Sequence, residues 1–363
     1  MIPDKTPNAS RIVLARTRRG LTKVALARRA GISTRALYDL ESGKATPTGD
    51  TLVAIAEALR FPVGFFYRPD VELPSADEAS FRSLRSMTAS KRDAALAAGA
   101  LAFEVSDWIE ERFTLPPPQV PDLHGYDPEA AASAVRALWK MGASPIGNMI
   151  HQLESRGVRV FSLAEDRRVD AFSLWHTDKP YVFLNTVKTA EHSRMDAAHE
   201  LGHLVLHRRT TAQGRNIESQ AQLFASAFLM PRSSVMATPK LMAPTLGHLV
   251  QLKKKWLVSA AALAHRLHNL GLLSDWNYRG LCIDLARFGR DREPEGIARE
   301  TSQIMDKVFG LSVDGVSKRS VASDLDLNQS DVEALVFGIR ATASTDSQRS
   351  PAKSRMRTNL RAV

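Results

Sequence analysis

The stretch "AAHELGHLVLHRR" occupies residues 197–209 and contains His199, Glu200 and His203 in the order H-E-x-x-H. Residues four positions apart lie one turn apart on the same face of an α-helix, so the two imidazoles can share one metal ion. Zinc accepts imidazole nitrogens at about 2.0–2.1 Å, and a site with three protein ligands keeps one position open. The glutamate beside the first ligand can then act as a general base on water. The motif therefore predicts a catalytic helix with Zn²⁺ as its cofactor.

A third ligand is expected from the run "NIESQAQLFASAFLMP" (216–231), which has the pattern of an amphipathic helix. Glu218 and Gln220 flank its apolar stripe on opposite sides, and geometry alone does not separate them. A carboxylate is a far better zinc ligand than a neutral amide, so chemistry favours Glu218. His207 continues the histidine stripe by one more turn. It could donate a hydrogen bond to one of the ligands, or it could be an ordinary histidine near the negative end of the helix dipole, and we favour the second interpretation.

Strand-like runs occur directly before the H-E-x-x-H segment and supply the clear β signal in the sequence. They are short, rich in aromatic and β-branched residues, and bounded by turn signals. The three runs are "VRVFSL" (158–163), "DAFSLWH" (170–176) and "YVFLN" (181–185). The other periodic segments have helical patterns. The sequence therefore predicts a mainly α protein in which an α+β unit holds a small three-stranded sheet and is followed by a helical C-terminal region.

The strands, then "HELGHLVLH", then "E-x-x-A-x-x-F-A-x-x-F-L-M-P" resemble the ImmA/IrrE family of metallopeptidases over about residues 130–275. The resemblance implies a zincin-like fold with metal ligands His199, His203 and Glu218 and with Glu200 as the general base. Members of the family cleave repressor-type regulators, often in stress responses or mobile elements, which implies a protein substrate of that kind. Many members have "E-x-E-A-N" where this chain has "E-S-Q-A-Q". A ligand at the position of Gln220 would leave the metal site crippled.

The N-terminal stretch "LTKVALARRAGISTRALYDLESGKATP" (21–47) has the pattern of a helix-turn-helix. Its threonine and serine at the starts of the two helices can act as N-caps, and Gly31 suits the turn between them. In such a motif the second helix lies in the major groove of DNA. The residues that we predict to contact DNA are Thr22, Ser33, Thr34, Arg35, Tyr38, Lys44 and Thr46.

Residues 11–66 resemble the Cro/repressor-like, XRE-type family through "RGLT", "LA", "GIS", "LYDLESG" and the later "LVAIAEAL" and "FF". The resemblance implies a five-helix domain that binds an operator in double-stranded DNA. A homodimer is among the assemblies that we expect for such a protein.

Length and composition fit this organisation. A chain of 363 residues is expected to form two or three domains, and its net charge of +10 suits a polyanionic partner. The single cysteine, Cys282, excludes an internal disulfide and leaves histidine and carboxylate to build a zinc site. The sequence has neither an apolar run of about 18–20 residues nor an apolar signal region at its start. We therefore expect a cytoplasmic protein without a membrane partner.

These signals predict both domain boundaries and a small set of functions. The predicted units are a helix-turn-helix domain (1–68), a helical linker region (69–127), an ImmA/IrrE-like metallopeptidase domain (128–280), a helical C-terminal region (281–342) and a disordered basic tail (343–363). The leading hypothesis is a DNA-binding regulator that also cleaves a repressor. One alternative is a transcription factor, or an antitoxin-like repressor, whose peptidase-like domain only senses or dimerises. Another is a peptidase whose N-terminal domain recruits its protein substrate.

Overall fold

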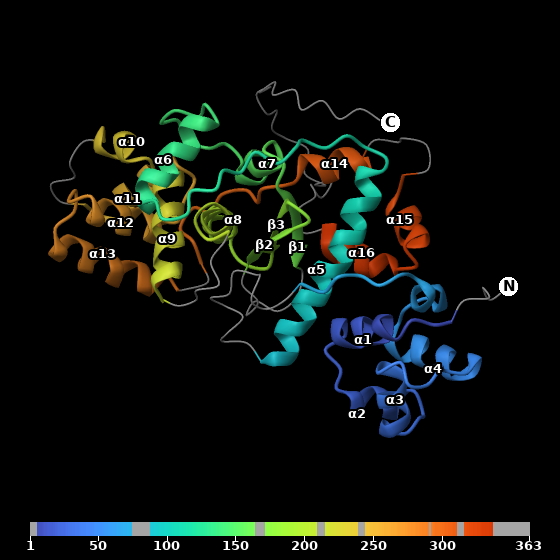
Figure 1. Ribbon diagram of the computed structural model, residues 1–363. Helices are drawn as coiled ribbons and strands as arrows, with labels where there is room; N and C mark the ends of the chain where they lie inside the picture. The colour runs from blue at the N-terminus through green and yellow to red at the C-terminus, as the bar shows by residue number, and fades with distance from the viewer. Residues whose placement is uncertain are drawn as a thin grey trace.

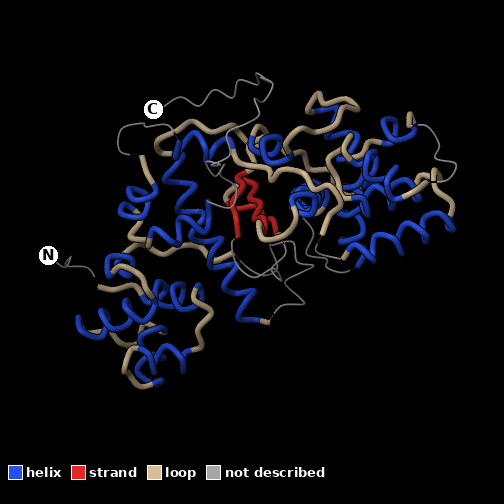
Figure 2. Tube along the Cα trace, turned by 180° about the vertical axis from the view of Figure 1, so that it is seen from behind, coloured by secondary structure: helices blue, strands red, loops and turns tan. Residues whose placement is uncertain are grey.

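The computed structural model describes residues 6–74, 88–163, 171–208, 215–238, 244–289, 292–310 and 316–336. The tail predicted at 343–363 lies outside these residues. The described residues form a mainly α protein with one three-stranded sheet, as the sequence predicts. Figure 1 shows the N-terminal helices as a separate bundle beside a larger helical body, and Figure 2 shows the sheet in red inside that body.

The N-terminal bundle has five helical elements, of which the last is a 3₁₀-helix. They are α1 (Ala9–Arg18), α2 (Lys23–Arg29), α3 (Thr34–Glu41), α4 (Gly49–Leu59) and η1 (Val63–Tyr67). Thr22 caps α2 and Ser33 caps α3, each by accepting a hydrogen bond from a backbone N–H three residues later. Gly31 has φ +67° in the turn between them, where a side chain would be strained. The sequence predicts both caps and this turn correctly.

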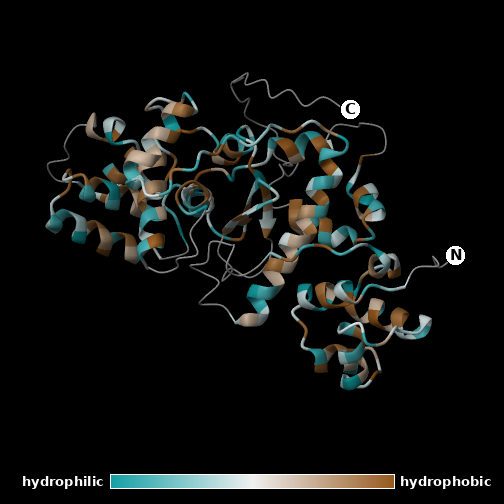
Figure 3. Cartoon of the chain, viewed as in Figure 1, coloured by the Kyte–Doolittle hydropathy of each residue, from teal (hydrophilic) through white to brown (hydrophobic). Residues whose placement is uncertain are grey.

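Helix α5 (Ala89–Glu110) is 22 residues long and lies within the core, although it falls in the predicted linker region. Its first turn is polar, and Figure 3 shows hydrophobic residues in brown along its middle. Small residues in "ALAAGALA" allow close packing: a Cβ on Gly99 would lie 3.5 Å from the ring of Phe183. The helix contacts α1 on one side and the sheet on the other, and so connects the bundle to the body.

The sheet has the strand order β1-β3-β2, with β1 (Arg159–Leu163) parallel to β3 (Lys179–Asn185) and β2 (Phe172–His176) antiparallel to it. Thr177 and Asp178 have positive φ values of 46° and 62°, as a tight two-residue hairpin requires. Figures 1 and 2 show α8 (Ala190–Leu206) on one side of the sheet and α5 on the other. The sheet therefore gives α8 a rigid support.

The other helices complete the body around α8. They are α6 (Pro128–Leu138), α7 (Met149–Glu154), α9 (Arg215–Leu229), α10 (Arg232–Met236), α11 (Leu246–Lys253), α12 (Ala260–Asn269) and α13 (Asp275–Phe288). Helix α9 packs directly on α8. The sequence did not predict α13, in which only Leu281 is buried while Trp276 is 85% exposed. A helix with so little buried surface has no clear apolar period to reveal it.

The C-terminal helices are α14 (Gln303–Gly310), α15 (Lys318–Asp324) and α16 (Gln329–Val336). Helix α14 begins only at Gln303, because residues 292–302 form an irregular segment that contacts α8 through the hydrogen bond from Ile297 to Glu191. Helix α16 returns to the sheet, where Ser162 of β1 donates a hydrogen bond of 2.8 Å to the carbonyl of Ala334. In Figure 1, α16 lies beside α5, and α15 lies above the N-terminal bundle.

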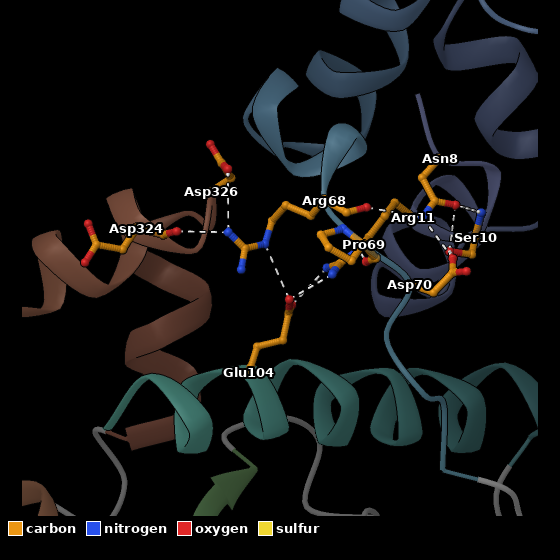
Figure 4. Close-up of polar contacts among 9 residues, drawn as sticks. All are labelled: Asn8, Ser10, Arg11, Arg68, Pro69, Asp70, Glu104, Asp324 and Asp326. Atoms are coloured by element: carbon orange, nitrogen blue, oxygen red, sulfur yellow. Dashed lines mark hydrogen bonds and ion pairs between the residues drawn. The ribbon is translucent and has the colours of Figure 1, made fainter. Parts of the chain in front are cut away.

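Ion pairs fix the N-terminal bundle to the body. Glu104 of α5 accepts hydrogen bonds of 2.9 and 2.8 Å from both terminal nitrogens of the buried Arg11, and it also pairs with Arg68 at 3.4 Å (Figure 4). Arg68 in turn donates to the carbonyl of Asp324 at 2.9 Å and lies 3.8 Å from the carboxylate of Asp326. Two arginines of the bundle thus bind both α5 and the loop that follows α15.

Candidate metal centre and DNA-binding face

Helix α8 carries the H-E-x-x-H motif and begins at Ala190, where Thr189 caps it by accepting from the N–H of His192. Its close neighbour α9 is possible because residue 202 is glycine. A Cβ on Gly202 would lie 3.1 Å from the ring of Phe224 and 3.2 Å from the backbone of Ala221. This close approach lets a side chain near the start of α9 reach the histidines of α8.

His199, His203 and Glu218 converge on one point. The Nε2 atoms of the two histidines are 3.1 Å apart. Glu218 places Oε2 at 3.3 Å from Nε2 of His199 and Oε1 at 3.6 Å from Nε2 of His203. One donor atom from each residue lies within 4.8 Å of the others, and these three form the one potential metal-binding group among the described residues.

The three side chains fit a divalent metal. Two imidazole nitrogens and one carboxylate oxygen are the donor set of a catalytic zinc site with three protein ligands. Within the described part of the chain, Oε2 of Glu218 is buried and makes no hydrogen bond of normal geometry. A buried acceptor without a hydrogen bond is costly, and a cation at the convergence point would satisfy it.

The electrostatic surroundings prepare these ligands. Burial lowers the pKa of His203 to about 4, although its close contact with Glu218 opposes this effect. Burial would raise the pKa of Glu218, but the close contacts with His199 and His203 lower it to about 2. For His199, burial lowers the pKa, but the contact with Glu218 and the charge of Glu200 outweigh it and raise the pKa. Near neutral pH the site therefore offers a neutral His203 and an ionised Glu218, as metal binding requires.

Glu200 lines the same pocket as His199 and His203. It is 4% exposed, and its carboxylate accepts a hydrogen bond of 2.7 Å from the hydroxyl of Ser173 on β2. Glu200 is recognisable from its motif, whereas the contact with Ser173 depends on how β2 pairs in the sheet and has no local signal in the sequence. The strand thus orients the carboxylate that we expected to be the general base.

The predicted DNA-contacting face lies on the side of the N-terminal bundle away from α5 (Figure 1). Tyr38 of α3 is 45% exposed, and the amines of Lys23 and Lys44 lie 4.7 and 5.6 Å from the centre of its ring. Arg35 pairs with Asp39 at 3.2 Å and keeps most of its side chain in solvent. All seven residues predicted to contact DNA are exposed, namely Thr22, Ser33, Thr34, Arg35, Tyr38, Lys44 and Thr46.

Comparison with known families identifies two domains along the chain. Residues 12–66 match a family described as a helix-turn-helix, and residues 153–268 match the IrrE N-terminal-like domain family. The chain joins an XRE-type helix-turn-helix domain to an ImmA/IrrE-type, metallopeptidase-like domain. A search of curated proteins gives no match. Among the described residues, no helix is both long and apolar enough to cross a bilayer.

One wall of the pocket lies outside the IrrE N-terminal-like match. Arg292 and Glu293, from the irregular segment after α13, line the same pocket as the residues of α8. The buried amine of Lys253 holds this wall in place, because it pairs with Glu293 at 2.9 Å and with Glu191 of α8 at 3.1 Å. These residues were not predicted from the sequence, because long-range ion pairs position their segment and no local motif marks it.

The two candidate ligands in "ESQAQ" have different neighbours. Glu218 faces His199 and His203, whereas Oε1 of Gln220 lies 2.9 Å from Nε2 of His207. His207 ends α8, as expected, but its Nδ1 also lies 3.0 Å from Nδ1 of His203. The structure thus separates two residues that sequence geometry could not. It also gives His207 a contact with a metal-ligand candidate, which was the less favoured of the two interpretations of this residue.

Proposed function

We propose that this chain is a DNA-binding transcriptional regulator that carries a zinc-dependent peptidase and cleaves a repressor-type regulator in a stress or mobile-element response. The observation that carries the proposal is the convergence of His199, His203 and Glu218 beside Glu200. The exposed basic face around Tyr38 supports the DNA-binding half.

In the proposed reaction, some residues of the pocket bind the metal and another transfers the proton. His199, His203 and Glu218 would hold the zinc ion. Bound zinc supplies a Lewis acid that polarises the scissile carbonyl and makes water easier to deprotonate. Glu200, oriented by Ser173, accepts a proton from the attacking water and passes it to the leaving amine.

In the DNA-binding half, α3 would enter the major groove. Arg35 at its start could bind a guanine edge with two hydrogen bonds, which reads sequence directly. Thr22 and Lys44, at the start of α2 and after α3, suit contacts to phosphates, which fix position without reading sequence.

A second candidate function also has support in the structure. Glu200 is almost fully buried and engaged by Ser173, and Gln220 is neutral where many relatives of the resembled family have an acid. These features favour a regulator whose peptidase-like domain binds metal without cleaving. In that case DNA binding would continue and proteolysis would be absent.

The deciding experiment incubates zinc-loaded protein with purified candidate repressors beside a Glu200→Gln variant of matched zinc content. The peptidase proposal expects cleavage by the native protein and at least a 100-fold slower reaction by the variant, in line with the share of general-base catalysis. Equal rates for the two proteins, or no cleavage by either, would leave the non-catalytic function. DNA binding that does not weaken with salt would instead favour recruitment of a protein partner by the N-terminal domain.

A further inference from the structure

We propose that Gln220 and His207 form a hydrogen-bonded relay that holds His203 in the tautomer and orientation required for zinc binding. The inference rests on the proposed zinc centre and assigns a positioning role to two residues that are not themselves ligands. In a metal-bound histidine, the N–H of the second ring nitrogen commonly donates a hydrogen bond to an acceptor, and this bond fixes the tautomer and the orientation of the ring.

The identity of the ligating atom follows from the geometry. Nε2 of His203 lies 3.1 Å from Nε2 of His199 and 3.6 Å from Oε1 of Glu218, so it is the nitrogen that faces the metal position. A ligating nitrogen carries no proton, and a neutral imidazole has one proton to place. That proton must therefore be on Nδ1 of His203, which points away from the metal position.

The contacts of His203 with His207 and of His207 with Gln220 are consistent with this position of the proton. Nδ1 of His203 lies 3.0 Å from Nδ1 of His207, so the first donates and the second accepts. His207 then carries its own proton on Nε2, which lies 2.9 Å from Oε1 of Gln220. The amide oxygen can only accept, so it ends the chain. All the hydrogen bonds point away from the metal.

The position of Gln220 explains why an amide can serve where a carboxylate is common. The relay needs an acceptor at its end, and either side chain supplies an oxygen there. The amide adds no charge to a site that already contains Glu200 and Glu218. It therefore orients His203 while making that ligand less electron-rich than a carboxylate would.

The test is zinc affinity, measured by competition with a chelator on the full-length chain. We expect Gln220→Ala and His207→Ala to weaken zinc binding about 10- to 100-fold, the usual cost of losing such a partner. Gln220→Glu restores the acceptor and should bind zinc at least as tightly as the native chain. Ser219→Ala, an exposed neighbour on α9, is the matched control and should change nothing.

A second measurement separates orientation of the ligand from loss of folding. In cobalt-loaded protein, visible absorption reports ligand geometry, and we expect Gln220→Ala but not Gln220→Glu to alter the spectrum. Zinc affinity of Gln220→Ala within twofold of native, with an unchanged cobalt spectrum, would overturn the relay while leaving the zinc centre intact. Failure of the native chain to bind zinc would instead remove the centre itself, and the relay with it.

Discussion

Arg19 and Asp331 are 312 residues apart in the chain, yet their guanidinium and carboxylate groups form two hydrogen bonds of 2.6 and 2.8 Å. The pair joins α1 of the helix-turn-helix domain to α16, and the side chain of Asp331 is only 4% exposed. Asn328 extends the contact by donating to the carbonyl of Arg60. The DNA-binding domain is therefore attached to the peptidase-like body at specific sites and is more than a tethered module.

Asp331→Ala should loosen this attachment. Removal of one partner from a buried pair is costly, but Arg19 is partly exposed and keeps bonds to the carbonyls of Leu59 and Arg60. We therefore expect the free energy of unfolding to fall by about 1–3 kcal/mol. Hydrogen exchange should speed up in α1 and α16 together. Glu333→Ala, which breaks a partly exposed pair within the α15–α16 hairpin, is the control. Unchanged exchange in α1 after Asp331→Ala would contradict the attachment.

Zinc should stabilise the native chain but not a Glu218→Ala variant. A ligand that binds only the native state stabilises it by about 2.7 kcal/mol at a hundredfold excess over Kd. We therefore expect a chelator to lower the thermal midpoint of native protein and to leave that of Glu218→Ala unchanged. Elemental analysis supplies the stoichiometry. Retention of one zinc per chain in the variant would show that Glu218 is not the third ligand.

The helix-turn-helix caps and the three ligand candidates follow from sequence because they obey local rules. Thr22 and Ser33 precede helical patterns by one residue, and His199 and His203 are related by the helical period alone. The choice of Glu218 as the third ligand candidate also depended on ligand chemistry, because its spacing does not distinguish it from Gln220 and a carboxylate binds zinc better than an amide. In each case the deciding information lies within a few turns of one segment.

The features missed from sequence depend on long-range contacts. Glu293 lines the pocket because Lys253 and Glu191, far apart in the chain, form a buried ion-pair cluster with it. The pair of Arg19 and Asp331 has no local pattern either. The periodicity of a single sequence reports only local structure. The attachment of the N-terminal domain and the position of Glu293 in the pocket are therefore visible only in the structure.

DNA binding should divide into contacts that read sequence and contacts that do not. Lys44→Ala should weaken binding to all sequences and reduce the salt slope by about 1, whereas Arg35→Ala should cost about 1–3 kcal/mol and relax specificity at one position. Fluorescence anisotropy with a site selected from random DNA, at several salt concentrations, measures both quantities. Lys254→Ala, at the C-terminal cap of α11 in the body, is the control. Identical effects of the first two variants would contradict the proposed docking of α3.

Glu154 sits at the end of α7 and faces the start of α14. Its side chain is 3% exposed and accepts hydrogen bonds from the hydroxyl of Ser302 and from the backbone N–H groups of Gln303 and Ile304. Burial nevertheless raises its pKa from 4.5 to about 7, because the hydrogen bonds only partly offset the loss of hydration. The folded protein therefore binds this proton more tightly than the unfolded chain does.

The stability of the chain should fall between pH 5 and pH 8 because of this one carboxyl. A pKa raised on folding contributes stability that is fully present below the unfolded value and is lost as pH rises through the folded value. The shift of Glu154 amounts to roughly 3 kcal/mol. Glu154→Gln has no proton to lose, so its urea midpoint should fall less over this range than that of native protein. The exposed Glu57→Gln should follow the native curve. Parallel curves for Glu154→Gln and native protein would refute the assignment, even if the variant were less stable throughout.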